Sequence, residues 1–332
     1  MKKLKILRCG DQNFWAYYWI SQEHARYTIH DMKYAKHDEV NLDDVDILYI
    51  HSPDITNSHA CLLPLQAREK NIKVIGAYAG NPHFWSPAER RTYRFADLIV
   101  TISPQTYSFA KFHYTNIPVI YLPESIDTNF FTPVPCNPGR FNVGWAGGTH
   151  KKVKRYHIAE DLDFPIYLKD NWRLQRNSQN KILTLDEMKE YYRKIDVLLV
   201  TSESECQPRT VLEAMATGKP VIATDVGSVS MLLEPEWVVP VNPEENVIRE
   251  MNARLTLLKK YPRLRKDVGL RNLNFIKKHF SWDSTKELWD NIFEYVYNNE
   301  TDKSIHDSRK FLIPFKKEFT SKFMKFERNK NG

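Results

Sequence analysis

The sequence contains no apolar run long enough to cross a bilayer, and it has only four cysteines in 332 residues. A membrane-spanning helix needs about 20 consecutive apolar residues and is therefore not expected. The cysteines lack the paired spacing of a disulfide framework: Cys9, Cys61, Cys136 and Cys206. We expect reduced thiols in the cytoplasm. The opening "MKKLKILRCGDQ" has the charge of a signal peptide, but Arg8 and Asp11 break its apolar part, which predicts a first β-strand.

Positive charge is concentrated in the last segment. Residues 303–332 hold nine Lys and Arg against three Asp and Glu, a net charge of +6 out of +7 for the whole chain. A repeat of phenylalanines four residues apart places one aromatic stripe on a helix with lysines beside it: Phe311, Phe315, Phe319 and Phe323. We expect residues 308–328 to bind an anionic membrane surface at the inner face of the cell membrane. The alternative is packing of this stripe on the protein's own body or on a second copy, as in a homo-oligomer. Nucleic acid is not the expected partner, because the aromatic and basic residues do not alternate.

Short apolar runs alternate with helical patterns along most of the chain. Five candidate strands precede residue 124 and five follow residue 140: residues 4–9, 45–51, 72–78, 97–103 and 117–123, then 141–147, 164–170, 196–202, 219–225 and 236–241. Helical spacing lies between them, as at 58–71, 104–114, 185–195 and 210–218, and continues from 244 to 299. Repeated βα units predict parallel sheets covered on both faces. The expected organisation is an N-terminal domain over 1–124, a proline-rich linker over 125–140, a C-terminal domain with closing helices over 141–300, and a basic tail over 301–332.

Two glutamates with seven residues between them stand out in "SESECQPRTVLEAMATGKPVIAT" (202–224). Glu205 lies in a loop, and Glu213 lies one turn inside the next helix, which Thr210 is expected to cap and Gly218 to end. Free amides at the start of that helix, near 210–212, suit a phosphate. Glu213 beside them suits the two hydroxyls of a ribose, and Glu205 suits a hydroxylated group beyond the phosphates. The bland alternative is a solvated loop glutamate and a helix-face glutamate.

This E-x7-E pattern followed by "AMATGKPVIAT" resembles the retaining GT-B glycosyltransferases of the family 4 type. The resemblance implies an α/β fold of two Rossmann-like domains with parallel sheets facing across a cleft, followed by C-terminal helices and here by the basic amphipathic tail. It implies a hexosyltransferase-like enzyme that moves a sugar from a nucleoside diphosphate sugar, such as a UDP- or GDP-sugar, to a hydroxyl of a glycan or glycolipid precursor. In that family the second glutamate holds the ribose and the first contacts the donor sugar. No cofactor and no metal are expected, since "DVD" (44–46) and "DLD" (161–163) are interpreted as surface turns.

The loop "VGWAGGTHKKVKR" (143–155) resembles the segment on which this family places an arginine and a lysine against the diphosphate. Gly147 and Gly148 would let the backbone approach a ligand. Trp145 stands where the family often has the arginine, so another cation must supply its charge. We favour Lys151 and Lys154, with Lys152 and Arg155 as the other candidates and a solvated basic loop as the alternative.

Arg209, beside the start of the predicted helix, is a further candidate for phosphate contact. Together with Thr210 and Val211 it is expected to complete the donor-binding site beside Glu213. His51, at the end of a predicted strand, is a candidate for contact with the donor sugar near the transfer point, and a structural role is equally open.

Gly10 is expected on the acceptor side. "YLPESIDTNFFTP" resembles the family's hinge, with Glu124 and Ser125 in place of the usual Asn and Gly, and its Asp127 is expected to form a turn. Cys206 has no histidine near it in sequence and is not expected to be a nucleophile. Two alternatives remain: a glycosyltransferase that acts on nucleic acid or protein, and a non-catalytic nucleotide-sugar-binding scaffold.

Overall fold

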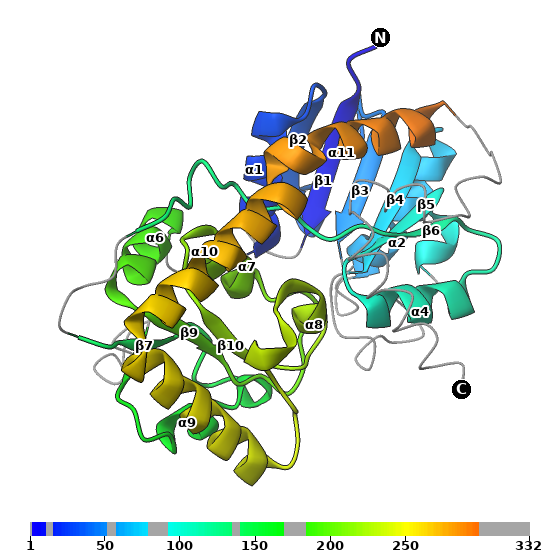
Figure 1. The fold of residues 1–332 in the computed structure, drawn as a ribbon. Coiled ribbons are helices and arrows are strands. Elements are labelled where there is room, and N and C mark those ends of the chain that lie inside the picture. Colours follow the sequence, from blue (N-terminus) through cyan, green and yellow to red (C-terminus); the bar gives the residue numbers. More distant parts are fainter. Residues whose placement is uncertain are drawn as a thin grey trace. The chain divides into compact units, whose positions relative to one another are not determined.

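The computed structural model describes residues 2–10, 16–51, 58–78, 92–134, 140–168 and 184–298. The chain divides into two compact units (Figure 1). Among the described residues, unit 1 comprises those up to Ser125 together with residues 282–298, and unit 2 comprises those within Ile126–Ser281. Among the described residues, no helix combines the length and apolar character that a bilayer crossing requires.

Unit 1 is built on a six-stranded sheet in which every neighbouring pair is parallel. Its spatial order is β2-β1-β3-β4-β5-β6: β1 (Lys5–Gly10), β2 (Asp31–Lys36), β3 (Ile47–His51), β4 (Lys73–Tyr78), β5 (Leu98–Thr101) and β6 (Val119–Tyr121). The described helices of this unit are α1 (Ala16–Tyr27), α2 (Ser58–Glu69), α4 (Pro104–His113) and α11 (Trp282–Tyr297), with short 3-10 turns η1 (His37–Glu39) and η3 (Tyr93–Phe95). All five residues of β3 are buried, as expected of a central parallel strand.

Unit 2 contains a second parallel sheet of five strands, in the order β11-β10-β9-β7-β8. The strands are β7 (Val143–Trp145), β8 (Ile166–Leu168), β9 (Val197–Val200), β10 (Val221–Thr224) and β11 (Val238–Val239). The helical elements are α5 (Tyr156–Glu160), α6 (Leu185–Lys194), α7 (Arg209–Ala216), α8 (Val229–Leu232), α9 (Glu244–Lys260), α10 (Pro262–His279), η4 (Lys152–Lys154) and η6 (Pro235–Trp237). The predicted α/β fold with two parallel sheets is therefore confirmed.

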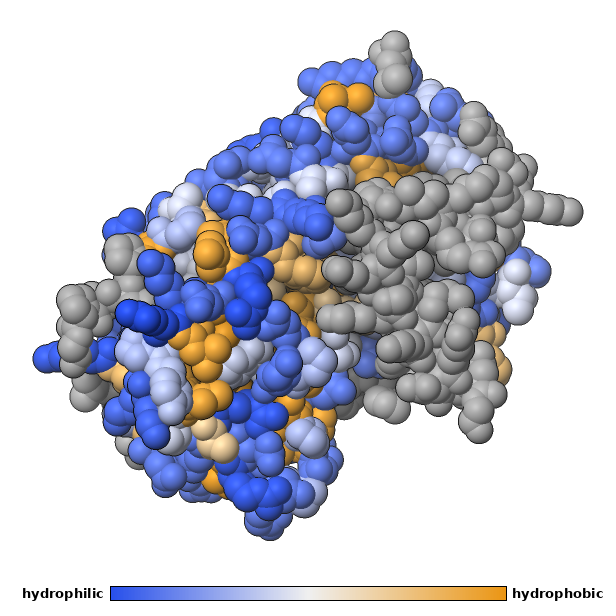
Figure 2. All heavy atoms as spheres, in the orientation of Figure 1, coloured by the Kyte–Doolittle hydropathy of each residue, from blue (hydrophilic) through white to orange (hydrophobic). Residues whose placement is uncertain are grey.

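Helix α9 shows how the second sheet is covered. Its buried side chains recur at helical spacing and join the core formed by β7, β9 and β10: Val247, Met251, Leu255 and Leu258. Polar residues occupy the opposite face, which accounts for the helix periodicity in the sequence. On the face of unit 2 seen in Figure 2, apolar residues lie in small areas between hydrophilic ones.

Two elements of unit 1, α1 and β2, are absent from the predicted series. Strand β2 is an edge strand in which only Met32 is buried, so it lacks an apolar run. Helix α1 buries Glu23 and His24 beside Ile20, so its buried face is partly polar. Periodicity of apolar residues cannot reveal a helix of this kind.

The long helical pattern after residue 244 forms three helices. Pro262 lacks the N–H that a continuous helix would need, so α9 ends and α10 begins there. The last helix, α11, belongs to unit 1, whereas the predicted C-terminal domain of residues 141–300 includes it. The reason is its packing: the Trp282 indole stacks on His24 at 4.4 Å between ring centroids and donates to Glu23 at 3.0 Å.

The predicted linker over 125–140 also differs from the structure. Unit 1 ends at Ser125, and the chain from Ile126 belongs to unit 2. Phe131 is fully buried there. The Asp127 carboxylate accepts hydrogen bonds from the backbone N–H groups of Asn129 and Phe130, both at 3.0 Å. Asp127 is thus a turn former, as predicted.

Candidate functional site

The candidate site of unit 2 lies where three neighbouring strands end. Trp145 ends β7, Thr201 and Ser202 follow β9, and Thr224 ends β10. Because these strands are parallel, their carboxyl ends lie at one edge of the sheet, and open α/β sheets bind ligands at that edge. The loops that continue from β7 and β9 carry the predicted basic and acidic residues.

Glu205 is held by one cation and one hydroxyl. Lys154 Nζ and Ser202 Oγ both donate to its Oε1, at 2.5 and 2.7 Å. The side chains of Lys154 and Glu205 keep 27% and 14% of their surface exposed, so the pair remains accessible to a ligand. The two loops are also joined through their backbones, since the N–H of Glu203 donates to the carbonyl of Val153 at 2.8 Å.

A glycine after β10 fixes the loop that carries Glu205. Gly227 has a φ of +55°, and a Cβ built on it would lie 2.0 Å from the carbonyl oxygen of Cys206. That carbonyl accepts from the N–H of Ser228 at 2.8 Å, and the Thr224 hydroxyl donates to the carbonyl of Ser202 at 2.6 Å. The loop is therefore packed too closely to admit any side chain at position 227.

Glu213 has a second, separate set of partners. Arg209 Nε, one turn earlier on α7, donates to Oε1 at 3.1 Å, and the Tyr192 hydroxyl donates to Oε2 at 2.9 Å. Glu213 is only 4% exposed. Burial, and then the nearby Glu213 charge, raise the pKa of Tyr192 well above its usual value, so this phenol remains a hydrogen-bond donor.

The start of α7 differs in detail from the prediction. Thr210 is not the N-cap, because the helix begins at Arg209 and Pro208 occupies the cap position without a side-chain bond. The N–H of Val211 donates to the carbonyl of Pro208 at 3.0 Å and is not a free amide. The predicted end is confirmed, since Gly218 has a φ of +73°.

Trp145 is joined to the basic loop by hydrogen bonds through Thr201. Its indole Nε1 donates to the hydroxyl of Thr201 at 2.9 Å, and this hydroxyl lies 2.8 Å from the carbonyl of Lys154, to which it donates. Gly147 packs on the same indole, because a Cβ there would lie 2.5 Å from its ring. A Cβ on Gly148 would lie 3.1 Å from the ring of His150 and 3.6 Å from Lys151 Cγ. Packing on Trp145 is therefore one reason why position 147 requires glycine, in addition to the predicted approach of a ligand.

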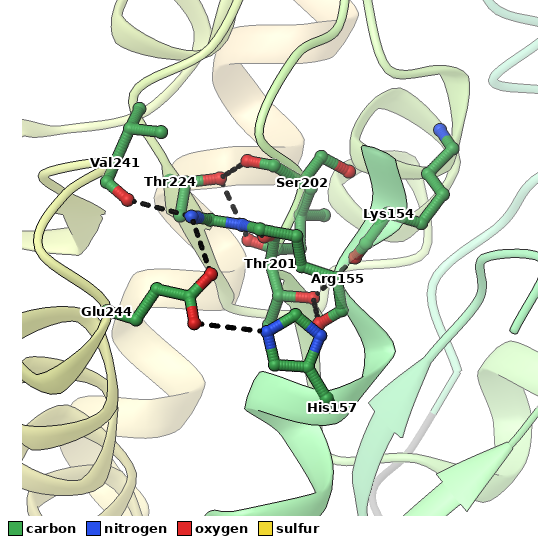
Figure 3. A network of polar contacts seen from close by, with 9 residues as sticks. Lys154, Arg155, His157, Thr201, Ser202, Thr224, Val241 and Glu244 are labelled. Atoms are coloured by element: carbon green, nitrogen blue, oxygen red, sulfur yellow. Dashed lines mark hydrogen bonds and ion pairs between the residues drawn. The ribbon is translucent and has the colours of Figure 1, made fainter. Parts of the chain in front are cut away.

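Arg155 belongs to the interior of the loop. The backbone of Arg155 has a φ of +47°. Its guanidinium donates hydrogen bonds to the carbonyls of Thr201 at 2.9 Å and Val241 at 3.0 Å. Glu244 lies 3.6 Å from the same guanidinium and 3.2 Å from the His157 ring (Figure 3). Figure 3 also shows the Lys154 side chain extending away from this cluster. We therefore assign Arg155 to loop structure, and Lys151, Lys152 and Lys154 remain the candidate cations of this loop.

His51 and Gly10 belong to unit 1. His51 is fully buried at the end of β3, and its Nε2 accepts from Arg8 Nε at 2.7 Å. Burial, and then the Arg8 charge, lower the pKa of His51 well below 6.5, so the ring is neutral. A Cβ on Gly10 would lie 2.9 Å from the Tyr34 hydroxyl.

The structure brings the predicted residues into two pairs, Lys154 with Glu205 and Arg209 with Glu213. Sequence reasoning missed Tyr192 and Ser202. Ser202 stands three residues before Glu205, a spacing at which a side chain in a loop readily reaches its neighbour. Within the described ranges, no group of three His, Cys, Asp or Glu residues is arranged to hold a metal ion. Cys206 is buried and forms no disulfide.

Comparison with known sequences gives a partial match. Residues 168–257 match the family model described as "Glycosyl transferases group 1". An uncharacterized glycosyltransferase of Methanocaldococcus jannaschii, MJ1178, is 28% identical over 164 residues, which are 44% of this chain and 46% of that protein. A second protein of that organism, MJ1607, is 33% identical over 96 residues, 26% of this chain and 24% of that protein. The chain thus spans less than half the length of these curated relatives.

Solved structures resemble the chain over much more of its length. Anabaena HepE, solved with UDP and glucose, has a TM-score of 0.67 at 12% identity and covers 88% of this chain and 99% of its own. A glycosyltransferase from Rickettsia africae has a TM-score of 0.66 at 15% identity, with 90% and 100% coverage. Sucrose-phosphate synthase from Thermosynechococcus elongatus has a TM-score of 0.62 at 16% identity, with 76% and 74% coverage. The chain therefore has the fold of GT-B glycosyltransferases, and its match to the group 1 family model lies in unit 2 of that fold.

Proposed function

We propose that this chain is a retaining, metal-independent glycosyltransferase that moves a sugar from a nucleoside diphosphate sugar to a hydroxyl group. The observation that carries the proposal is the pairing of each motif glutamate with a cation: Glu205 with Lys154, and Glu213 with Arg209. Both pairs lie in unit 2, which also contains the group 1 family match. A donor with phosphates and hydroxyls offers partners to all four side chains.

The pairs suggest how such a donor is bound. Phosphate oxygens would compete with Glu205 for Lys154 and with Glu213 for Arg209. Each glutamate would then turn a carboxylate oxygen to a hydroxyl, with Glu213 on the ribose and Glu205 on the transferred sugar. The cations would remain beside the phosphates, where negative charge grows as the sugar leaves, and stabilisation of such developing charge is usually the largest catalytic contribution.

The structural relatives suggest which nucleotide to test first. HepE has been solved with UDP, with UDP and glucose, and with UDP-glucose. We therefore propose a UDP-sugar as the donor, with GDP-sugars as the comparison, and no other cofactor.

The acceptor is proposed from the resemblance and from the tail. A glycan or lipid-linked acceptor would suit an enzyme kept at the inner face of the cell membrane by residues 308–328, which lie outside the described residues. His51 would contact the donor sugar, and Gly10 would lie on the acceptor side.

The test is UDP release from UDP-sugars by the wild-type chain and by three variants. Glu213→Gln and Glu205→Gln should each weaken turnover about 10- to 100-fold, the loss expected of one hydrogen bond to a charged group, 1.5–3 kcal/mol. Glu245→Gln, an exposed glutamate on α9, is the matched control and should behave as wild type. Binding of the nucleotide without turnover by the wild type would indicate a scaffold protein instead, and equal release by Glu213→Gln would remove Glu213 from the donor site. The anomeric configuration of the product, read by NMR, tests retention.

A further inference from the structure

A fully buried arginine connects several polar residues of unit 1. Arg8 lies on β1 with no exposed surface. Its Nε donates to His51 Nε2 at 2.7 Å, its Nη1 lies 3.1 Å from His24 Nδ1, and its Nη2 donates to Glu124 Oε1 at 2.6 Å. The guanidinium also lies over the Tyr49 ring, 4.6 Å from the centroid. One side chain thus connects β1, α1, β3 and the segment that follows β6.

This geometry fixes the tautomer of His51. A guanidinium has five N–H donors and no acceptor, so a ring nitrogen in contact with it must be the acceptor. His51 Nε2 is therefore unprotonated, and the proton of the neutral ring lies on Nδ1. The same reasoning puts the proton of His24 on Nε2.

The tautomer limits what His51 can do in a reaction. With a proton on Nδ1 and an arginine against Nε2, the ring has no free lone pair with which to accept a proton from a hydroxyl. Its remaining function is to donate a hydrogen bond from Nδ1. In the part of the chain that the structure describes, this buried Nδ1 has no hydrogen-bond partner. An unsatisfied buried donor is costly for a protein, and a ligand that accepts this hydrogen bond would remove the cost.

The groups around His51 favour this neutral donor state. The Tyr17 and Tyr49 rings stack on it at 4.6 and 4.8 Å between centroids. The His37 ring contacts the carbonyl of His51 at 3.1 Å. Arg8 is positively charged, and His24 would become so if it were protonated. Glu124 is the acidic group that balances the charge of Arg8. A protonated His51 would face the guanidinium across 2.7 Å without an acceptor.

We propose that Arg8 and Glu124 are positioning residues that hold His51 as a neutral hydrogen-bond donor for the substrate. The assignment of a substrate to His51 rests on the proposed function, whereas the tautomer does not. A buried ion pair contributes little net stability compared with apolar residues of the same volume, so fixing the position of its partners is the role that suits Arg8 and Glu124.

The first experiment reads the tautomer directly in the wild-type chain. In ¹⁵N-histidine-labelled protein, His51 should show a protonated Nδ1 and an unprotonated Nε2, unchanged between pH 8 and 6. His51→Gln identifies the resonances. A proton on Nε2, or an imidazolium in this pH range, overturns the proposal even if every other variant fails to fold.

The second experiment follows Arg8→Lys. A lysine keeps the charge beside Glu124, but its single ammonium cannot span His51, His24 and Glu124 together. The His51 signals should then report a mixture of tautomers, and kcat should fall about tenfold with the KM for the nucleotide sugar unchanged, as expected for one misdirected hydrogen bond. Thr285→Val is the matched control, since it removes a buried hydroxyl contact to Ser125, 2.6 Å long, without touching Arg8 or His51.

The outcomes separate the two proposals. A single Nδ1–H tautomer in wild type and an unchanged tautomer in Arg8→Lys would refute the positioning role of Arg8. A second outcome would refute the proposed function and leave the tautomer assignment intact. In that outcome the NMR result is as expected, the wild type shows no turnover, and Glu213→Gln binds UDP as the wild type does. An equal loss of kcat in Thr285→Val would show that any damage to unit 1 lowers activity, which would also refute a specific role for Arg8.

Discussion

Acidification should destabilise unit 1 more steeply than an average protein, because two of its buried histidines are neutral. His24 and His51 are fully buried, and burial followed by the Arg8 charge lowers the pKa of both well below 6.5. In the unfolded chain each would bind a proton near its ordinary pKa of about 6.5. The unfolded state therefore binds more protons than the folded state once the pH falls below that value, and the free energy of unfolding decreases.

The magnitude follows from proton linkage. Each histidine that is protonated only in the unfolded chain changes the free energy of unfolding by about 1.4 kcal/mol per pH unit. For two histidines the slope approaches about 2.7 kcal/mol per pH unit well below pH 6.5, and the total loss from pH 7.5 to 5.5 is about 2.7 kcal/mol. A typical domain has only 5–15 kcal/mol of stability, so this loss is readily measured.

Urea unfolding at constant ionic strength, at pH values from 7.5 to 5.5, measures this slope. His51→Gln removes one of the two protons and should halve the slope, which also separates this effect from the titration of carboxylates at lower pH. A free energy of unfolding that stays constant from pH 7 to 5.5 would contradict this reasoning. It would show that the two histidines bind as many protons in the folded chain as in the unfolded chain. An unchanged slope in His51→Gln would exclude His51 as a source.

Three further predictions concern unit 2 and the tail. Gly227→Ala should raise the KM for the donor and lower the free energy of unfolding by about 1–2 kcal/mol or more. The left-handed backbone disfavours a side chain, and the new Cβ would overlap the Cys206 carbonyl. Steady-state kinetics measures the KM, and thermal unfolding measures the stability. Thr201→Val should lower stability by 1–3 kcal/mol by leaving the Trp145 indole N–H without its acceptor, and a normal Tm would contradict that role. Deletion of residues 305–332 should abolish sedimentation with anionic liposomes but leave UDP release intact, and unchanged sedimentation would place the phenylalanine stripe elsewhere.

Much of the fold can be predicted from the sequence because parallel strands buried on both faces are short apolar runs. All ten predicted runs overlap a strand of the structure, as at 45–51 for β3 and 219–225 for β10. A pattern of apolar runs does not reveal an element that is only partly buried or whose buried side chains are polar. Edge strand β2 has one buried residue, and α1 buries a glutamate and a histidine that find partners only in the folded chain.

The candidate site could be predicted only where its residues are close in sequence. The spacing of Glu205 and Glu213 is visible in one loop and one helix. Tyr192 contacts Glu213 from a different helix, 21 residues earlier, and no local pattern connects the two. The pair of Arg8 and Glu124 is separated by 116 residues, and a charged residue inside a strand carries no sign of its distant partner.

The discontinuity of unit 1 has a consequence for synthesis on the ribosome. Unit 2 is one uninterrupted segment, Ile126–Ser281, and all of it is made before α11. The aromatic residues that cover His24, among them Trp282 and Phe293, emerge last, although the sheet they complete was translated first. The amino-terminal part of unit 1, residues 1–125, therefore keeps its histidine-bearing surface uncovered until translation has passed residue 293.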